Sequence, residues 1–99
     1  MIASSNPPVG NGLTDLYAET VGESIPVSAT LSHTLLLHNR TGVDVLIGDA
    51  VSLGTSPATG LVLADGADFG VHLHSPDRML ARIVDSQNVT GLHVLIVTD

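Results

Sequence analysis

Two histidines, two residues apart, are the side chains whose type and spacing come nearest to chemistry. His72 and His74 lie on a segment, 68–74, in which apolar residues alternate with polar or small ones. Because side chains alternate across a β-strand, both imidazoles would share one face, roughly 6.5–7 Å apart along the chain. Two imidazoles placed in this way can bind one metal ion, with His93 or Asp68 as candidates for a third ligand.

The segment Gly66–His74 is similar to the front half of the first metal-binding motif of cupins. In cupins a Glu follows the second His after three or four residues, but Arg78 and Met79 stand here. The second cupin motif has no counterpart in this chain. The favoured interpretation is therefore two surface histidines on an outward strand face. A small cupin-like metal-binding protein remains the alternative, and no cofactor is expected.

Other catalytic arrangements find no support in the sequence. The chain has no Cys and no Gly-x-Ser-x-Gly nucleophile turn. Its carboxylates are scattered singly through predicted loops rather than paired for acid–base work. No Gly-rich phosphate loop precedes a helix. We therefore do not expect an enzyme.

Composition favours a protein that contacts other proteins. The chain has 99 residues, enough for one domain, and only 13% of them are charged, about half the usual share. A formal net charge of −7 with three Arg and no Lys argues against a nucleic-acid or anionic-membrane partner, and neither is expected. No apolar run reaches the roughly 18 residues of a membrane span, and the first residues do not read as a secretory signal. An ordinary soluble monomer is the alternative.

Short β-branched and Leu-rich runs separated by Gly, Pro, Asn and Asp predict an all-β domain over residues 15–99, an antiparallel sandwich or barrel. Residues 39–42 and 64–67 have the composition of hairpin turns. No long helical stripe is present, so a helix of more than two turns is not expected. Strands are predicted near 16–20, 25–29, 32–38, 43–48, 61–63, 67–74, 78–85 and 91–97.

Residues 1–14 are predicted to form an extended N-terminal arm. Pro7 and Pro8 are stiff and extended, and a Gly-Asn-Gly run at 10–12 is flexible. The arm would be either a disordered tail or a segment that orders on a partner. In the second case its contact residues would be Ile2, Pro7, Pro8, Val9 and Leu13. Its deletion would then weaken attachment and leave the domain folded.

The order of features over residues 31–97 has a further likeness. A Leu-rich strand ends at Asn39 with Thr41-Gly42 at the turn, and 43–48 follows as Val-Asp-Val-Leu-Ile-Gly. Thr59-Gly60-Leu61 then leads to an alternating strand and to the terminal strand 92–97. This order resembles small β-sandwich virion proteins of tailed bacteriophages, especially those of actinobacterial hosts. The matching positions are structural, so no binding residue is carried over, and Val45 and Leu80 are aliphatic where the group often has an aromatic residue.

The resemblance implies a structural virion protein, most simply a capsid decoration protein on the outer surface of an icosahedral phage head. It would be made in the host cytoplasm, bind the major capsid protein and stabilise the head. Such proteins often form homo-oligomers, with a trimer favoured. A tail or head–tail accessory ring protein is the main alternative, and a host-surface or glycan adhesion module is another.

Overall fold

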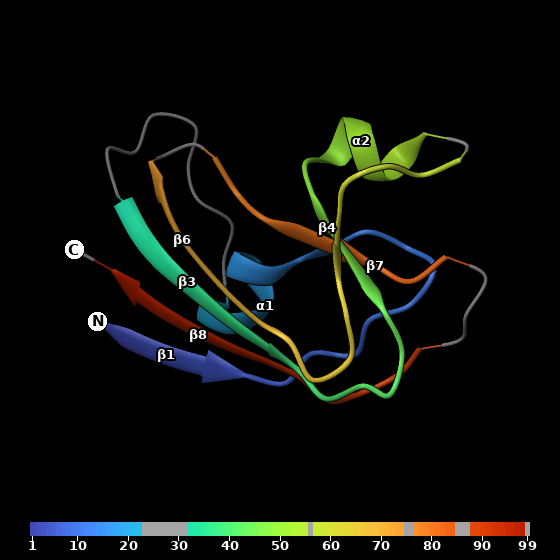
Figure 1. The fold of residues 1–99 in the computed structure, drawn as a ribbon. Helices are drawn as coiled ribbons and strands as arrows, with labels where there is room; N and C mark the ends of the chain where they lie inside the picture. Colours follow the sequence, from blue (N-terminus) through green and yellow to red (C-terminus); the bar gives the residue numbers. More distant parts are fainter. Residues whose placement is uncertain (23–31, 56, 75–76, 85–87, 99) are drawn as a thin grey trace.

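The computed structural model describes residues 1–22, 32–55, 57–74, 77–84 and 88–98. Within these ranges the chain forms eight strands and two helices of fewer than two turns each (Figure 1). The elements are β1 (Ile2–Ser5), β2 (Thr14–Asp15), α1 (Leu16–Val21), β3 (Ser32–Asn39), β4 (Val45–Gly48), α2 (Ala50–Gly54), β5 (Leu61–Leu63), β6 (Asp68–His74), β7 (Leu80–Arg82) and β8 (Leu92–Thr98). The strand predicted at 25–29 lies outside the described residues.

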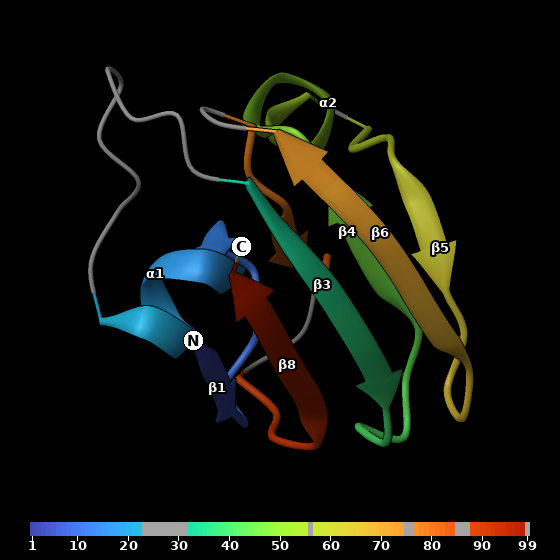
Figure 2. The same cartoon turned by 90° about the vertical axis from the view of Figure 1, so that its left-hand side faces the viewer.

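The strands form two antiparallel sheets that face each other across one core (Figures 1 and 2). The first sheet has the order β1-β8-β3-β6, and the second sheet has the order β2-β7-β4-β5. This arrangement confirms the predicted small all-β fold and makes it a sandwich. The alternation predicted from the sequence sets the inner face of each strand, because buried and exposed positions alternate along β3 and β8.

The core between the sheets is almost purely aliphatic. Tyr17, from α1, is the one Phe, Tyr or Trp side chain among the buried residues that the structure describes. Both sheets contribute, the first through Leu35, Leu37, Leu92, Val94 and Ile96, and the second through Val45, Ile47, Leu63 and Ala81, with Ile83 directly after β7. β8 lies between β1 and β3, which is the central position expected for a strand that is apolar on both faces.

The first fourteen residues are largely extended, as predicted, but they belong to the sandwich and do not form a separate arm. β1 pairs with β8, from Ile2 opposite Val97 to Ser5 opposite Val94. Val9 is fully buried in the shared core and exchanges two backbone hydrogen bonds with Val89, of 2.9 and 2.8 Å. The sequence prediction was wrong on this point because strand pairing supplies the partner that this Pro- and Gly-containing segment lacks locally.

Val9 gives a direct test of this correction. The substitution Val9→Ala is expected to lower the free energy of unfolding by about 2 kcal/mol, because it leaves a cavity in a closed core. Pro8→Ala, at the exposed neighbouring position, should change it by less than about 0.5 kcal/mol. Urea denaturation measures both values. Equal effects of the two substitutions would mean that Val9 is not part of the core and would support a separate N-terminal arm.

Residues 16–21 form a helix where a strand was predicted at 16–20. Asp15 caps the helix, since its Oδ1 accepts hydrogen bonds from the backbone N–H groups of Tyr17 (3.1 Å) and Ala18 (3.2 Å). Gly22 ends it with a φ of 93° and donates to the Ala18 carbonyl. The Asp and Gly at these two positions outweigh the weak alternation of the apolar residues between them. The helix buries Leu16 and Tyr17 in the core, beside β1 and β8 (Figure 1).

The two predicted hairpin turns carry the chain from one sheet to the other instead. Residues 40–44 join β3 of the first sheet to β4 of the second, and residues 64–67 return from β5 to β6. Gly42 (φ 88°) and Gly66 (φ 85°) do take the left-handed conformation that turn chemistry requires. The hairpin prediction was wrong. The turn residues determine that the chain reverses, but they do not determine which strand the next segment pairs with.

Both crossings meet at Asn39, whose side chain is fully buried. Its Nδ2 donates to the carbonyl oxygens of Val43 (2.9 Å) and Leu63 (2.8 Å). Its Oδ1 accepts from the backbone N–H (3.0 Å) and the hydroxyl (2.7 Å) of Thr41. The Asn39 carbonyl also accepts from the N–H of Gly66 at 2.6 Å. One amide group therefore joins the two sheets at this end of the sandwich.

Candidate functional site

The candidate site is the surface of the first sheet that points away from the core, which we call the outer face. Four of the five histidines of the chain lie on it. The strand registers place the outward-pointing residues of its four strands side by side. The outer face consists of Ile2, Ser4, Ser32, Thr34, Leu36, His38, Asp68, Gly70, His72, His74, His93, Leu95 and Val97.

A shallow apolar groove of about 830 Å³ runs across this face. Leu36 and Leu95 are cross-strand neighbours at its floor, and Leu36 is 43% exposed. Gly70 lies opposite Leu36 on β6, and a Cβ at that position would come within 2.9 Å of Leu36 Cδ2. The missing side chain at Gly70 therefore opens the groove beside Leu36. His38 and His93 form one end of the groove.

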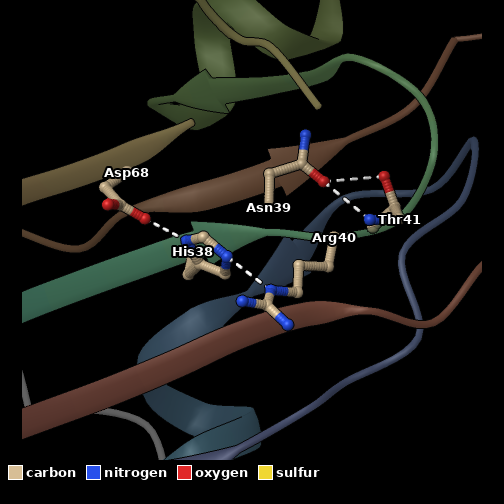
Figure 3. A network of polar contacts seen from close by, with 5 residues as sticks. All are labelled: His38, Asn39, Arg40, Thr41 and Asp68. Atoms are coloured by element: carbon tan, nitrogen blue, oxygen red, sulfur yellow. Dashed lines mark hydrogen bonds and ion pairs between the residues drawn. The ribbon is translucent and has the colours of Figure 1, made fainter. Parts of the chain in front are cut away.

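A chain of polar contacts borders this end of the groove (Figure 3). His38 Nδ1 contacts the carboxylate of Asp68, which is its cross-strand neighbour. Arg40 Nε donates a 2.6 Å hydrogen bond to His38 Nε2. Both ring nitrogens of His38 are therefore engaged, Nδ1 by the carboxylate of Asp68 and Nε2 by the guanidinium of Arg40. In a catalytic dyad the Nε2 atom would receive a proton from a nucleophile. Here this atom accepts the hydrogen bond from Arg40 instead.

The other end of the outer face holds the two histidines singled out in the sequence. They share a face as predicted, and their ring centroids are 5.1 Å apart. Their Nδ1 atoms hydrogen-bond with the hydroxyl groups of the facing β3 residues, His72 with Thr34 (3.0 Å) and His74 with Ser32 (3.2 Å). These contacts orient the rings across the strand pair and not toward a common centre.

His93, the candidate third ligand, is not brought to this pair. It lies opposite His38, with ring centroids 6.5 Å apart, whereas His72 lies opposite Thr34. Four residues along β3 separate the two positions, which is about 13 Å. Within the described ranges no three His, Asp or Glu side chains gather closely enough to hold a metal ion.

The five predicted contact residues do not form one surface. Ile2 (71% exposed) lies at the edge of the outer face. Leu13 (47% exposed) directly precedes β2, which belongs to the second sheet. Pro8 is exposed, but Pro7 and Val9 are buried. Pro7 and Val9 therefore cannot contact a partner, and of the five only Ile2 lies on the outer face. The groove itself was missed in the sequence, where Leu36 and Leu95 read as ordinary strand residues.

His33 is the exception among the histidines, because its side chain is only 1% exposed. It points into the core from β3, on the face opposite to His38, as the sequence predicted. Its ring lies 4.9 Å from that of Tyr17, and its Nδ1 has no hydrogen-bond partner within the described part of the chain. Burial lowers the pKa of the imidazole, and His72 lowers it further, while the carboxylate of Asp15 opposes the change.

This lowered pKa predicts a loss of stability in acid. Above about pH 6.5 His33 is neutral in both the folded and the unfolded chain, and its contribution to stability is complete. Below about pH 6.5 the unfolded chain takes up the proton first, so the free energy of unfolding falls until the pH passes the folded-state pKa. His33→Leu should remove this part of the pH dependence, measured by urea denaturation from about pH 7.5 to about pH 5.

The matched control for His33 is His93→Gln on the outer face, which should retain the pH dependence. If His33→Leu and the unsubstituted protein lost stability equally on acidification, the buried imidazole would not be the cause.

Comparisons of the chain with protein-family models, with curated proteins and with solved structures found no match. Neither of the two short helices in the described part of the chain has the length and apolar character needed to cross a membrane.

Proposed function

We propose that this protein is a structural virion protein that decorates and stabilises the outer surface of an icosahedral phage head by binding the major capsid protein. The observation that carries the proposal is the groove of the outer face, with Leu36 and Leu95 at its floor. The resemblance over residues 31–97 supplies the class of partner, and the groove supplies a surface of the right kind.

The chemistry of the outer face suits a protein surface. Its floor is apolar, and its borders are mostly hydroxyl groups and imidazoles, which resemble the apolar core and polar rim of protein interfaces. Asp68 is its one carboxylate, and it contacts His38. Docking here desolvates few charges, so little of the energy of contact is lost to unpaired ions.

The charge distribution supports a place outside the head, away from packaged DNA. All three Arg side chains are engaged within the chain: Arg40 with His38, Arg78 with Asp15 at 2.9 Å, and Arg82 with Asn11 at 2.9 Å. They are spread over separate strands and loops rather than forming a patch for phosphates.

Stabilisation would follow from selective binding. A protein that binds the assembled lattice and not its disassembled subunits lowers the free energy of the lattice by mass action. Each copy needs only modest affinity, because the contact is repeated at every equivalent position. The same surface would serve a tail or head–tail accessory ring, which is the second candidate and differs in the number of copies bound. The metal-binding alternative has no specific support in the geometry, because His93 is distant from the imidazoles of His72 and His74.

The groove can be tested by substitution. The double variant Leu36→Ser/Leu95→Ser should weaken binding to heads that lack the protein by about tenfold per residue, because each Leu loses roughly 1.4 kcal/mol of apolar contact. Val51→Ser/Val62→Ser is the matched control, since these side chains are 75% and 55% exposed on α2 and β5, away from the outer face. Unchanged binding by the groove variant, or equal losses in both, would exclude the groove as the contact.

A further inference from the structure

Asn11 and Gly12, which we call the Asn-Gly link, form a short exposed connection just before β2. The chain is held on both sides of the link: the carbonyl of buried Gly10 accepts a 2.8 Å hydrogen bond from the N–H of Ile83, and β2 begins at Thr14. A Cβ at Gly12 would meet nothing within 4 Å. The N–H of Gly12 donates to no acceptor within the part of the chain that the structure describes. The link is therefore fixed at both ends and open in the middle.

This arrangement permits a reaction of the chain with itself. The Gly12 nitrogen attacks Cγ of Asn11, so that a new N–Cγ bond closes a succinimide ring and Nδ2 leaves as ammonia. The Gly12 nitrogen gives its proton to solvent, and the departing amine takes one from solvent. Water then opens the ring at either carbonyl, which yields aspartate or isoaspartate at position 11 and needs no oxidant or reductant. A following glycine favours the attack, because it has no Cβ to obstruct the approach of its nitrogen.

The other three asparagines of the chain lack a free N–H at the position that would have to attack. The residue after Asn6 is a proline, which has no N–H. The residue after Asn39 donates its N–H to the Gly91 carbonyl at 2.9 Å. The residue after Asn88 donates its N–H to the Val9 carbonyl at 2.8 Å. Among the described residues, only the Asn-Gly link therefore places an unengaged nucleophile beside an asparagine side chain.

Arg82, at the end of β7, holds the group that would be attacked. Its Nη2 donates a 2.9 Å hydrogen bond to Asn11 Oδ1, and its Nη1 donates to the Leu53 carbonyl, which fixes the guanidinium in place. When the Gly12 nitrogen attacks Cγ, negative charge develops on Oδ1. A cationic donor that already lies on this oxygen stabilises the developing charge, as the donors of an oxyanion hole do.

The same guanidinium also contacts the peptide group that contains the nucleophile. Arg82 Nε donates a 2.7 Å hydrogen bond to the backbone carbonyl of Asn11. This carbonyl and the Gly12 nitrogen belong to one peptide group and share its delocalised electrons. A positively charged donor on the oxygen therefore favours loss of the proton from the nitrogen. One side chain thus acts on both reacting groups.

We propose that Asn11 is a modification site of this protein, where Arg82 promotes deamidation through a succinimide formed with Gly12. Where the ring opens to ordinary aspartate, the new carboxylate lies against the guanidinium that held the amide, and an ion pair replaces the contact with a neutral group. Asn11 and Arg82 both line a pocket of about 440 Å³, which gives water access to the ring. The product carries one negative charge beyond the formal −7 of the chain. The modification does not depend on the proposed binding to a phage head.

The first test follows the incorporation of heavy oxygen from labelled water into the full chain, with peptide mass spectrometry to locate the label. The unsubstituted protein is incubated in the folded state and, in parallel, unfolded in urea, where Arg82 no longer contacts the Asn-Gly link. We expect label at position 11 of the folded protein, at a higher rate than in the unfolded chain, and none at the other three asparagines over the same time. No label at position 11 of the folded protein, or faster labelling in the unfolded chain, would overturn the proposal.

The second test separates promotion by Arg82 from simple restraint of the link. Arg82→Gln removes the guanidinium and should slow labelling at position 11 by about tenfold, which corresponds to about 1.4 kcal/mol of transition-state stabilisation. If Arg82 only held the link still, the same substitution would free the link and speed the reaction. Arg78→Gln is the matched control and should leave the rate unchanged, because Arg78 contacts Asp15 and not the link. Equal or faster labelling in Arg82→Gln, or an equal slowing in Arg78→Gln, contradicts the role of Arg82.

Gly12→Ala tests the nucleophile and keeps Arg82 in place. It should slow labelling at position 11 by at least about tenfold, because the new Cβ obstructs the attack. It should leave the thermal unfolding midpoint unchanged, because that Cβ meets nothing within 4 Å. An undiminished rate would mean that water hydrolyses the side chain directly, without the ring, and would overturn the proposal. If Arg82→Gln fails to fold, this variant and the comparison of folded with unfolded protein still decide the outcome.

Discussion

Replacing Asn39 with Ala is expected to lower the free energy of unfolding by about 3–5 kcal/mol. The substitution leaves the buried carbonyl of Leu63 without its partner, removes the bonds of the amide to the Val43 carbonyl and the Thr41 N–H, and leaves a cavity where a fully buried side chain stood. Each such group costs about 1–3 kcal/mol when it stays dry, and losses within one network reinforce one another. Because a domain of this size has only about 5–15 kcal/mol of stability, the variant should lie close to unfolding at room temperature.

Asn6→Ala is the matched control for this substitution. Asn6 is exposed, and its Oδ1 accepts one hydrogen bond, of 2.9 Å, from the N–H of Gly91. Its loss should cost about 1 kcal/mol or less, because water replaces the missing partner. Urea denaturation of the two variants compares a buried with an exposed amide. Similar losses in both would mean that the Asn39 network does not join the sheets as described.

The second large effect is expected at Gly91, which precedes β8 and lies against the same end of the sandwich. Its φ is 116°, and a Cβ there would come within 2.7 Å of the Arg40 carbonyl carbon and 3.0 Å of Thr41 Cα. Both atoms belong to the backbone, and the backbone N–H of Arg40 also donates a 2.9 Å hydrogen bond to the Gly91 carbonyl, so neither backbone segment can move cheaply. Gly91→Ala should therefore cost more than about 3 kcal/mol.

Gly66→Ala separates backbone strain from crowding. Gly66 also has a positive φ, of 85°, but a Cβ there would meet nothing within 4 Å. It should cost only about 1 kcal/mol, the penalty of the left-handed conformation alone. Thermal unfolding followed by circular dichroism ranks the two. If Gly66→Ala were as damaging as Gly91→Ala, the close approach of residues 40 and 91 would not explain the requirement for glycine.

The fold class could be predicted because it depends on local alternation. β3, β5, β6 and β8 lie within a residue or two of their predicted ranges, and along β3, β6 and most of β8 more and less exposed side chains alternate. The pairing of strands could not be predicted, because it depends on partners far along the chain. Turn residues at 39–42 and 64–67 indicated reversals correctly, yet each reversal crosses between sheets. β1 has little apolar character of its own and becomes a strand only beside β8.

The candidate site was predictable only in part. Strand alternation placed His72 and His74 on one face and His33 and His38 on opposite faces, and both predictions are confirmed. The groove depends on the absence of a side chain at Gly70 opposite Leu36, and that neighbourhood follows from the β3–β6 register rather than from any sequence motif. The signal available in the sequence was a glycine inside an otherwise regular alternating strand, which often marks a close approach.

The most direct test of the proposed function is co-sedimentation of the purified protein with phage heads that lack it, followed by counting the bound copies at saturation. A decoration protein should saturate at a copy number that scales with the number of capsomers, and it should raise the temperature at which the heads release their DNA. Binding of a single small ring of copies would instead support the tail or head–tail role. No sedimentation with the heads, at concentrations where the protein remains folded, would contradict the virion function altogether.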